Sequence, residues 1–206
     1  MSFEQRMKSA LSAGIEKLNE TEFVKSVQSG DNTREIYKEY LRYAYHYVRE
    51  TSSFTPLAAR RMDPKHLRVR KWLLEHSSEE MGHELMALRD LERLGEDKEK
   101  VQNSKIPVGV TAWASFFHYK VSMANPFCAF GVLYFLEGMA QEMAPKVLVP
   151  IVQNLPDSEK KAITFFKEHG ELDAEHMKEQ EALIFSMKLT KEEEDAMVQT
   201  VEEAAE

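Results

Sequence analysis

Helical periodicity is the feature that most constrains the fold of this chain. Apolar residues recur every three or four positions through nearly all 206 residues, as at Met7, Leu11, Ile15 and Leu18. No segment shows the strict apolar and polar alternation that is typical of a half-buried strand. Glycine (8) and proline (7) are few, which also favours helices. We therefore predict an all-α protein that folds as a single domain over residues 1–206.

The turn and capping signals divide the chain into predicted helices. Before the middle of the chain, helices are expected over 3–27, 33–50, 56–62 and 64–95, with a bend at the TSSF run and a stop at Gly95. KIPVG at 105–109 is expected to be a loop, followed by helices over 111–123 and from Asn125-Pro126 onward. In the second of these, Pro145 and Pro150 should kink or end the helix. Asp157-Ser158 can cap a helix reaching about Met187, and Thr190 with Glu193 forms a capping box for the last helix.

The charge and the single cysteine exclude several classes of protein. The formal net charge is −8, which argues against nucleic acid or an anionic membrane as the main partner, because such surfaces require clustered Lys and Arg. Cys128 is the one cysteine, so no internal disulfide can form. The opening MSFEQRMKSA has no apolar signal segment, and no apolar run approaches the roughly 20 residues that span a bilayer. We expect a cytoplasmic protein.

The segment HGELDAEHMKE carries three potential metal ligands. His169, Asp173 and His176 stand at positions i, i+4 and i+7, which places them within about 60° of one another on a helix. A single polar residue of this kind usually faces water. Three on one face are better explained by a site for iron, manganese or zinc, because imidazole and carboxylate are ligands of these metals.

A second group lies in the segment HSSEEMGHE. Here His76, His83 and one of Glu79 or Glu80 share a helix face. The spacing of Glu80 and His83 is one that di-iron proteins built on helical bundles use, since the two side chains can bind the same metal ion. Glu79 is almost as well placed, so both glutamates remain candidates.

Glu137 stands alone among apolar residues in the segment GVLYFLEGMA. An unpaired buried carboxylate is costly unless a cation meets it. A metal ion would serve, and the alternative is an ion pair with Lys or Arg in the core. We therefore treat Glu137 as a third source of metal ligands.

The helix predicted over 33–50 offers further candidates. Glu39, Tyr43, His46 and Glu50 share one of its faces. His46 interrupts the run YAYHYV and is as consistent with a hydrogen-bonded core histidine as with a ligand. The tyrosines Tyr43, Tyr47 and Tyr134 would line or approach the site. Cys128, in an apolar segment, is usually a small buried hydrophobe, and it becomes a candidate nucleophile only if it faces the pocket beside a base.

These segments together resemble a known superfamily. With LRYAYHYVRETSSF, HSSEEMGHELMALRDLERLG, GVLYFLEGMA and HGELDAEHMKE in this order, the chain resembles the haem-oxygenase-like superfamily over nearly its whole length. The resemblance implies a bundle of about seven helices. The ligand pattern is most similar to the haem-oxygenase-like di-iron oxidases, a group that includes N-oxygenases, fatty-acid oxidases that form terminal alkenes and a p-aminobenzoate-forming protein.

The resemblance implies a ligand set and a reaction class. It implies two iron ions per chain, or manganese or zinc in their place, with O2 as co-substrate and a small organic molecule as substrate. An early helix of the family usually supplies a carboxylate, but His46 stands near that position here, with Glu50 and Glu39 as alternatives, and His76 adds an imidazole. Tyr43 and Tyr134 are the expected catalytic side chains. The expected metal ligands are His46, Glu79 or Glu80, His83, Glu137, His169, Asp173 and His176.

Three other functions remain open within the same fold. A haem oxygenase requires a proximal histidine in its first helix, whereas the first histidine here is His46, in the second predicted helix. The thiamin-degrading members use a cysteine nucleophile, but the spacing of Cys128 and Tyr134 does not match the pattern expected for them. A non-catalytic binding protein is the third alternative. An exposed apolar helix face could support a homodimer.

Overall fold

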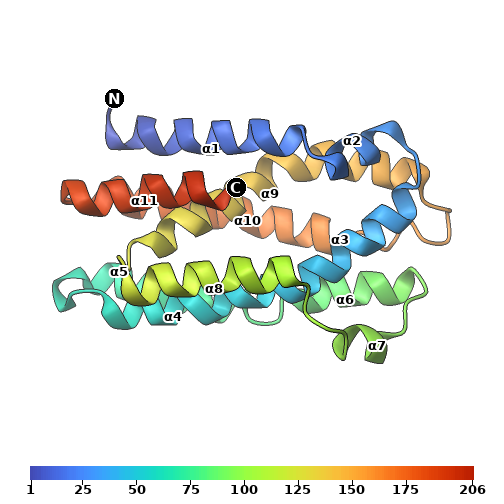
Figure 1. The fold of residues 1–206 in the computed structure, drawn as a ribbon, viewed down its shortest axis with the longest axis horizontal. Coiled ribbons are helices and arrows are strands. Elements are labelled where there is room, and N and C mark those ends of the chain that lie inside the picture. Colours follow the sequence, from blue (N-terminus) through green and yellow to red (C-terminus); the bar gives the residue numbers. More distant parts are fainter.

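The computed structural model describes residues 1–206, apart from the side chain of Glu171. Over this range the chain forms eleven α-helices, two short 3-10 helices and no strand (Figure 1). The all-α prediction is therefore confirmed. The α-helices are α1 (Phe3–Asn19), α2 (Glu22–Ser29), α3 (Thr33–Tyr47), α4 (Thr51–Arg61), α5 (Leu67–Glu80), α6 (Glu84–Arg93), α7 (Lys98–Gln102), α8 (Val108–Met123), α9 (Cys128–Asn154), α10 (Thr164–Ile184) and α11 (Lys191–Ala204).

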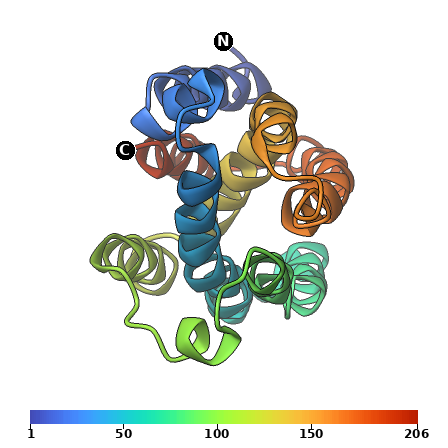
Figure 2. The ribbon, with the colours of Figure 1, turned by 90° about the vertical axis from the view of Figure 1, so that its right-hand side faces the viewer.

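Helix α9 runs through the middle of the bundle, and the other long helices surround it (Figure 2). Its first half is buried on almost every side, as its apolar sequence requires. Gly131 permits the close approach of α11, because a Cβ atom there would lie 2.5 Å from the Met197 carbonyl oxygen and 2.6 Å from Cβ of Thr200. Helices α1 and α10 also pack against α9, so a polar side chain on its inner face is removed from water.

Several predicted boundaries differ from the structure. The TSSF run belongs to α4, which continues the helical path of α3 through the 3-10 turn Val48–Glu50. Helix α9 continues through Pro145 and Pro150, where its buried residues Met143, Val147 and Ile151 hold it against its neighbours. Residues 157–161 form turns, so α10 begins only at Thr164. The capping box of Thr190 and Glu193 is present as predicted.

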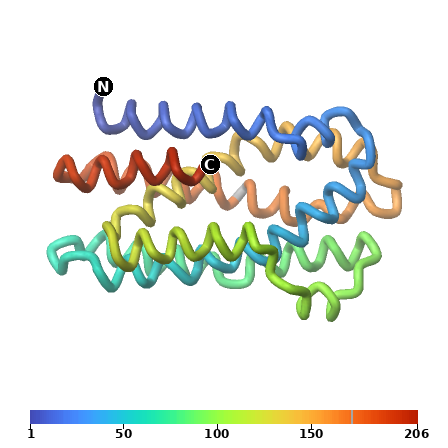
Figure 3. The backbone as a smooth tube through the Cα atoms, in the orientation of Figure 1, coloured from blue at the N-terminus to red at the C-terminus, as the bar shows by residue number. Residues whose placement is uncertain are grey.

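The helix predicted over 64–95 is broken in a way that matters for the site. Helix α5 ends at Glu80 and α6 begins at Glu84, and Gly82 between them has a φ of +97°. Only glycine adopts this backbone conformation readily. A loop of three residues therefore interrupts the helix, and α6 continues in the same general direction as α5 (Figure 3). None of the described helices is both long and apolar enough to cross a membrane.

Candidate metal centre

The end of α5 supplies the first part of the candidate centre. His76 and Glu80 lie one turn apart on the buried face of α5, with 2% and 3% of their surface exposed. The break at Gly82 turns the following residue back toward this face. As a result, Nδ1 of His83 lies 3.3 Å from Oε1 of Glu80. Two histidines and a carboxylate thus meet although they do not belong to one continuous helix.

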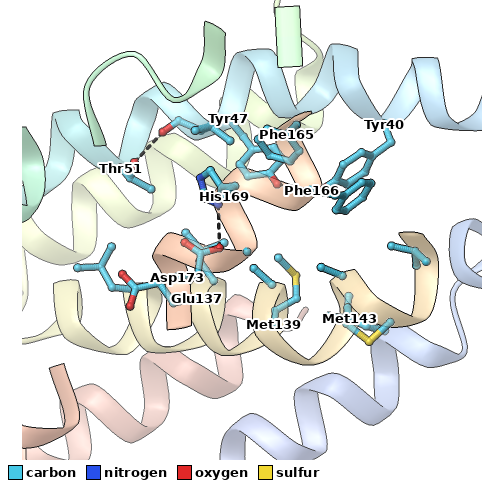
Figure 4. Close-up of a pocket in the computed structure, with 18 of the residues that line it drawn as sticks. Tyr40, Tyr47, Thr51, Glu137, Met139, Met143, Phe165, Phe166, His169 and Asp173 are labelled. Carbon is cyan, nitrogen blue, oxygen red and sulfur yellow. Dashed lines mark hydrogen bonds and ion pairs between the residues drawn. The ribbon is translucent and has the colours of Figure 1, made fainter. Parts of the chain in front are cut away.

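Helix α10 supplies the second part. His169, Asp173 and His176 lie on the α10 face that packs against α9, and Asp173 and His176 are buried (Figure 4 shows His169 and Asp173). Nδ1 of His169 lies 2.8 Å from Oδ2 of Asp173, while its Nε2 lies 3.9 Å from Oε2 of Glu80. Nδ1 of His176 lies 3.5 Å from Oε1 of Glu80. The predicted shared face of this triplet is the face turned toward α5 and α9.

Glu137 enters from α9 and has 4% of its surface exposed. Its Oε1 lies 3.4 Å from Nε2 of His76 and 3.9 Å from Nδ1 of His176. Among the described side chains, the ion-pair partners of Glu137 are histidines, and no Lys or Arg reaches it. The alternative of a core ion pair with Lys or Arg is therefore not what the structure contains.

Two groups of potential metal ligands share Glu80. In the first, ligand atoms of His76, Glu80 and His176 all lie within 4.8 Å of one another. The second consists of Glu80, His83 and His169 at the same spacing. A carboxylate has two oxygens, so Glu80 can face both groups at once. The arrangement has the form of a dinuclear site with one shared carboxylate.

Buried polar atoms without partners test whether metal ions fit this site. Seven such atoms belong to it, within the described part of the chain: Nδ1 and Nε2 of His76, Nδ1 of His83, Oε1 and Oε2 of Glu137, Nε2 of His169 and Nδ1 of His176. Leaving buried polar groups unpaired is costly, and native proteins rarely do so without a reason. Divalent ions would pair with these atoms, and a donor set of imidazole nitrogens and carboxylate oxygens suits iron, manganese and zinc. The residues present therefore fit a metal centre.

Burial separates the charge states of the site. It raises the pKa of Glu137 well above its usual range, and the negative charges of Asp173 and Glu80 add to the effect. Burial also lowers the pKa of His76 to about 4. Burial would raise the pKa of Glu80 too, but His83, whose Nδ1 lies 3.3 Å from its Oε1, and the nearby His169 and His76 outweigh burial and hold that pKa at about 2. Near neutral pH the metal-free site thus contains an ionised Glu80 and a neutral His76, while burial favours the protonated form of Glu137.

The early-helix candidates lie outside both ligand groups. His46 is buried, but its Nε2 lies 2.9 Å from Oγ of Ser104. Glu50 pairs with His118, with 3.2 Å between Oε2 and Nε2. Glu39 is exposed in a surface groove beside α2. For His46, the structure thus matches the core-histidine alternative.

The remaining predicted residues also lie apart from the centre. Tyr43 is 42% exposed and lines the same surface groove as Glu39. The Tyr134 hydroxyl donates a hydrogen bond of 2.9 Å to Oε1 of Glu181, away from the ligand groups. Cys128 is buried with its Sγ 3.9 Å from the Ala196 carbonyl oxygen, facing α11. Glu79 is different: its side chain is 58% exposed, but its Oε2 lies 3.4 Å from Nε2 of His176.

Sequence reasoning missed Thr51. Its hydroxyl donates a hydrogen bond of 2.7 Å to the Val48 carbonyl and lies 3.3 Å from Oε2 of Glu80 (Figure 4 shows Thr51). The polar TSSF run predicts a bend, and a bend gives no reason to expect that Thr51 faces inward. Reading α3 and α4 as one helical path would have placed Thr51 four residues after Tyr47, on the same side.

A mostly apolar cavity adjoins the centre, with a volume of about 160 Å³. His76, Glu80, Glu137, His169 and Asp173 form one end. The rest is lined mainly by apolar and aromatic side chains of α1, α2, α3, α9 and α10, among them Leu18, Val24, Met139, Met143, Val147, Phe165 and Phe166 (Figure 4). Tyr40 and Tyr47 also line it, and their hydroxyls lie 3.2 Å apart.

Comparison with known proteins identifies the family. The model of a family described as iron-containing redox enzyme matches residues 38–206, so the chain belongs to that family. A domain of unknown function from Shewanella denitrificans, with a haem-oxygenase-like fold, matches with a TM-score of 0.85 at 24% identity over 100% of this chain and 88% of that one. A TenA homologue from Pseudomonas syringae pv. tomato matches with a TM-score of 0.77 at 16% identity over 99% of this chain and 88% of that one. No curated protein matches the chain. The predicted haem-oxygenase-like fold is confirmed.

Proposed function

We propose that this protein is a non-haem oxidase or oxygenase with a dinuclear metal centre, which uses O2 to oxidise a small organic substrate. One observation carries the proposal: two pairs of histidines, the first buried and the second largely buried, share the single carboxylate of Glu80, and their unpaired nitrogen atoms lie around it. The description of the family as iron-containing redox enzymes supports iron as the metal. Manganese and zinc use the same ligands and are alternatives.

The residues divide naturally between two metal positions. His76 and His176 would hold the first position, with Glu137 beside them. His83 and His169 would hold the second, and Glu80 would serve both. When bound there, two redox-active ions supply the electrons that O2 chemistry requires.

The protein's own contribution includes the handling of a proton at Glu137. Burial raises the pKa of this carboxyl group, so in the metal-free protein it holds its proton to a higher pH than a free glutamic acid does. A metal ligand must be ionised, so metal binding at this position expels the proton. The negative charge that remains offsets part of the positive charge of the ions in a region of low dielectric.

The cavity would hold the substrate and exclude water. Its volume of about 160 Å³ is close to that of an engineered apolar cavity of about 150 Å³ that stays dry and binds benzene. The substrate is therefore a small molecule, or one that places a small apolar part inside. Burial raises the pKa of Tyr47 to about 12, so its hydroxyl stays protonated and can donate a hydrogen bond at the cavity wall.

The thiaminase-like alternative is less well supported. It requires Cys128 to act as a nucleophile beside the substrate. Cys128 is not among the described residues that line the cavity, and its sulfur faces α11. Cys128→Ala should therefore cause little loss of the protein's activity, whereas near-complete loss of activity would favour the alternative.

Anaerobic titration of the metal-free protein with Fe(II) tests the proposal. We expect about two ions per chain, as the two ligand groups imply, and a new optical absorbance after a pulse of O2. Glu80→Gln should reduce both uptake and absorbance, because it weakens the shared ligand. His46→Gln is the matched control and should change neither, since His46 contacts Ser104. Absence of iron uptake by the wild-type protein, or of any O2-dependent absorbance after uptake, would contradict the proposal.

A further inference from the structure

The two nitrogens of His176 face opposite environments. Nδ1 points into the centre, 3.5 Å from Oε1 of Glu80 and 3.9 Å from Oε1 of Glu137. Nε2 points the other way and lies 3.4 Å from Oε2 of Glu79. Glu79 and Glu80 are neighbours at the end of α5, yet one lies behind the imidazole ring and the other in front of it.

His169 shows the same division with the nitrogens exchanged. Its Nδ1 contacts Asp173 at 2.8 Å, and its Nε2 faces Glu80 at 3.9 Å. Each α10 histidine therefore has one nitrogen directed at the shared carboxylate and the other next to a second carboxylate. For His169 that second carboxylate comes from its own helix, whereas for His176 it comes from α5.

A carboxylate behind an imidazole has a definite chemical effect. Neutral histidine carries one proton on either nitrogen, and only the nitrogen without a proton can bind a metal ion. A carboxylate next to Nε2 accepts a hydrogen bond from an Nε2–H group, which leaves the lone pair of Nδ1 free. Such partners fix the orientation of the ring and make it a stronger ligand.

We propose that Glu79 is the positioning residue of His176 rather than a metal ligand. It favours the His176 tautomer with the proton on Nε2 and so prepares Nδ1 for the first metal position. This inference deepens the proposed function and rests on it for the metal, but the tautomer is a property of the metal-free protein. It also gives different roles to two residues that helical spacing alone left equivalent: Glu80 would bind the metal ions, and Glu79 would orient the His176 ring.

The exposure of Glu79 limits the size of the effect. Loss of such an outer partner typically weakens metal binding 10- to 100-fold. The side chain of Glu79 is 58% exposed, and solvent weakens exposed charge interactions. We therefore expect the lower end of the range, about tenfold.

Three variants test the role of Glu79. Glu79→Ala removes the carboxylate, and Glu79→Gln keeps an oxygen that can still accept a hydrogen bond. Glu75→Ala is the matched control, because Glu75 lies one turn earlier on α5, is 55% exposed and pairs with Lys71. The proton position on His176 is read in the metal-free protein by ¹⁵N NMR, and Zn²⁺ affinity is measured by competition with a chelator. Thermal unfolding verifies that each variant is folded.

The expected results are specific to a positioning role. The wild-type protein and Glu75→Ala should show His176 protonated on Nε2. Glu79→Ala should lose this preference. It should bind Zn²⁺ at the first metal position about tenfold less tightly, with the number of bound ions unchanged. Glu79→Gln should give a tautomer preference and an affinity between those of the wild type and Glu79→Ala. An unchanged tautomer and affinity in Glu79→Ala would overturn the inference, as would the loss of a whole Zn²⁺ equivalent, which would make Glu79 a ligand. If the wild-type protein took up no metal at all, the proposed function would fail, while the NMR measurement would still decide whether Glu79 orients His176.

Discussion

Nε2 of His76 lies 3.4 Å from Oε1 of Glu137, and in the described structure neither atom has a hydrogen-bond partner. In water two such groups would form an ion pair between roughly pH 4.3 and pH 6.5. Here burial lowers the pKa of His76 to about 4 and raises that of Glu137, so burial favours the neutral form of both groups in the metal-free protein. The pair is therefore poised to receive a metal ion: the histidine is already a competent ligand, and the glutamic acid becomes one by releasing a proton.

The neutral state of His76 predicts how stability depends on acid. Because its pKa falls from 6.5 when unfolded to about 4 when folded, the unfolded chain binds an additional proton between these values. The contribution of His76 is thus complete above pH 6.5 and is lost as the pH falls toward 4. Urea unfolding of the metal-free protein should show a larger loss of unfolding free energy between pH 7 and pH 5 for the wild type than for His76→Gln. Equal losses in the two proteins would contradict this assignment.

Glu137 should act in the opposite direction. Its pKa is raised on folding, so its contribution is present below the unfolded value of 4.5 and is lost as the pH rises above it. Glu137→Gln removes this cost. We expect the variant to exceed the wild type in metal-free unfolding free energy at pH 8, and by less at pH 5. The same variant should bind Fe(II) more weakly, so a variant that is more stable and binds iron as tightly as the wild type would argue against Glu137 as a ligand.

The candidate ligands that depend on local geometry could be placed together from the sequence. His169, Asp173 and His176 face the centre because one helix carries all three at spacings that share a face. Glu137 was predictable from its apolar neighbours, because burial of that segment necessarily buries the carboxylate. These inferences needed no knowledge of how the helices pack.

Contacts between distant segments could not be predicted in the same way. Helical spacing alone made Glu79 and Glu80 equivalent, and the position of α10 decides which one faces inward. His46 stood near an expected ligand position, but its partner Ser104 is 58 residues away in the chain. Packing also overrides local signals in α9, which continues through two prolines because its apolar faces are buried on several sides.

The break between α5 and α6 should be sensitive to substitution at Gly82. An alanine there would have open space, since the nearest atom to its Cβ is Leu85 Cδ1 at 3.9 Å, but the φ of +97° is strained for any residue with a side chain. We expect Gly82→Ala to lower the unfolding free energy by about 1–2 kcal/mol. It should also weaken the metal position that depends on His83 more than the one held by His76 and His176.

Gly109→Ala is the control for this prediction. Gly109 lies in the first turn of α8, has no positive φ and would present its Cβ to open space. Alanine should be neutral or slightly stabilising there, because it is the better helix former. Calorimetric unfolding and metal titration of both variants provide the measurement. Equal stability of Gly82→Ala and the wild type would show that the turn does not need glycine.

The cavity predicts a separation between metal binding and ligand binding. Ala144 lines the cavity from α9, two turns beyond Glu137. Helix α10 lies opposite Ala144, because a Cβ atom at Gly170 would lie 3.8 Å from the Cβ atom of Ala144. Ala144→Phe should fill this end without touching a ligand. Benzene is a suitable probe, since cavities of this volume bind it. We expect benzene to stabilise the wild-type protein against thermal unfolding in a concentration-dependent way. The variant should bind benzene at least about tenfold more weakly. Its Fe(II) uptake should equal that of the wild type.

Two further variants make this test decisive. Phenylalanine can overpack the site and cost about 1–3 kcal/mol, so Ala140→Leu offers a smaller obstruction of the same cavity. Val149→Phe is the matched control, because Val149 belongs to the same helix but is 55% exposed. It should leave both the benzene effect and iron uptake unchanged. If benzene stabilised Ala144→Phe and Ala140→Leu as strongly as the wild type, the apolar cavity would not be the ligand site, and the substrate would have to reach the centre from the surface side of α5, where Glu79 lies.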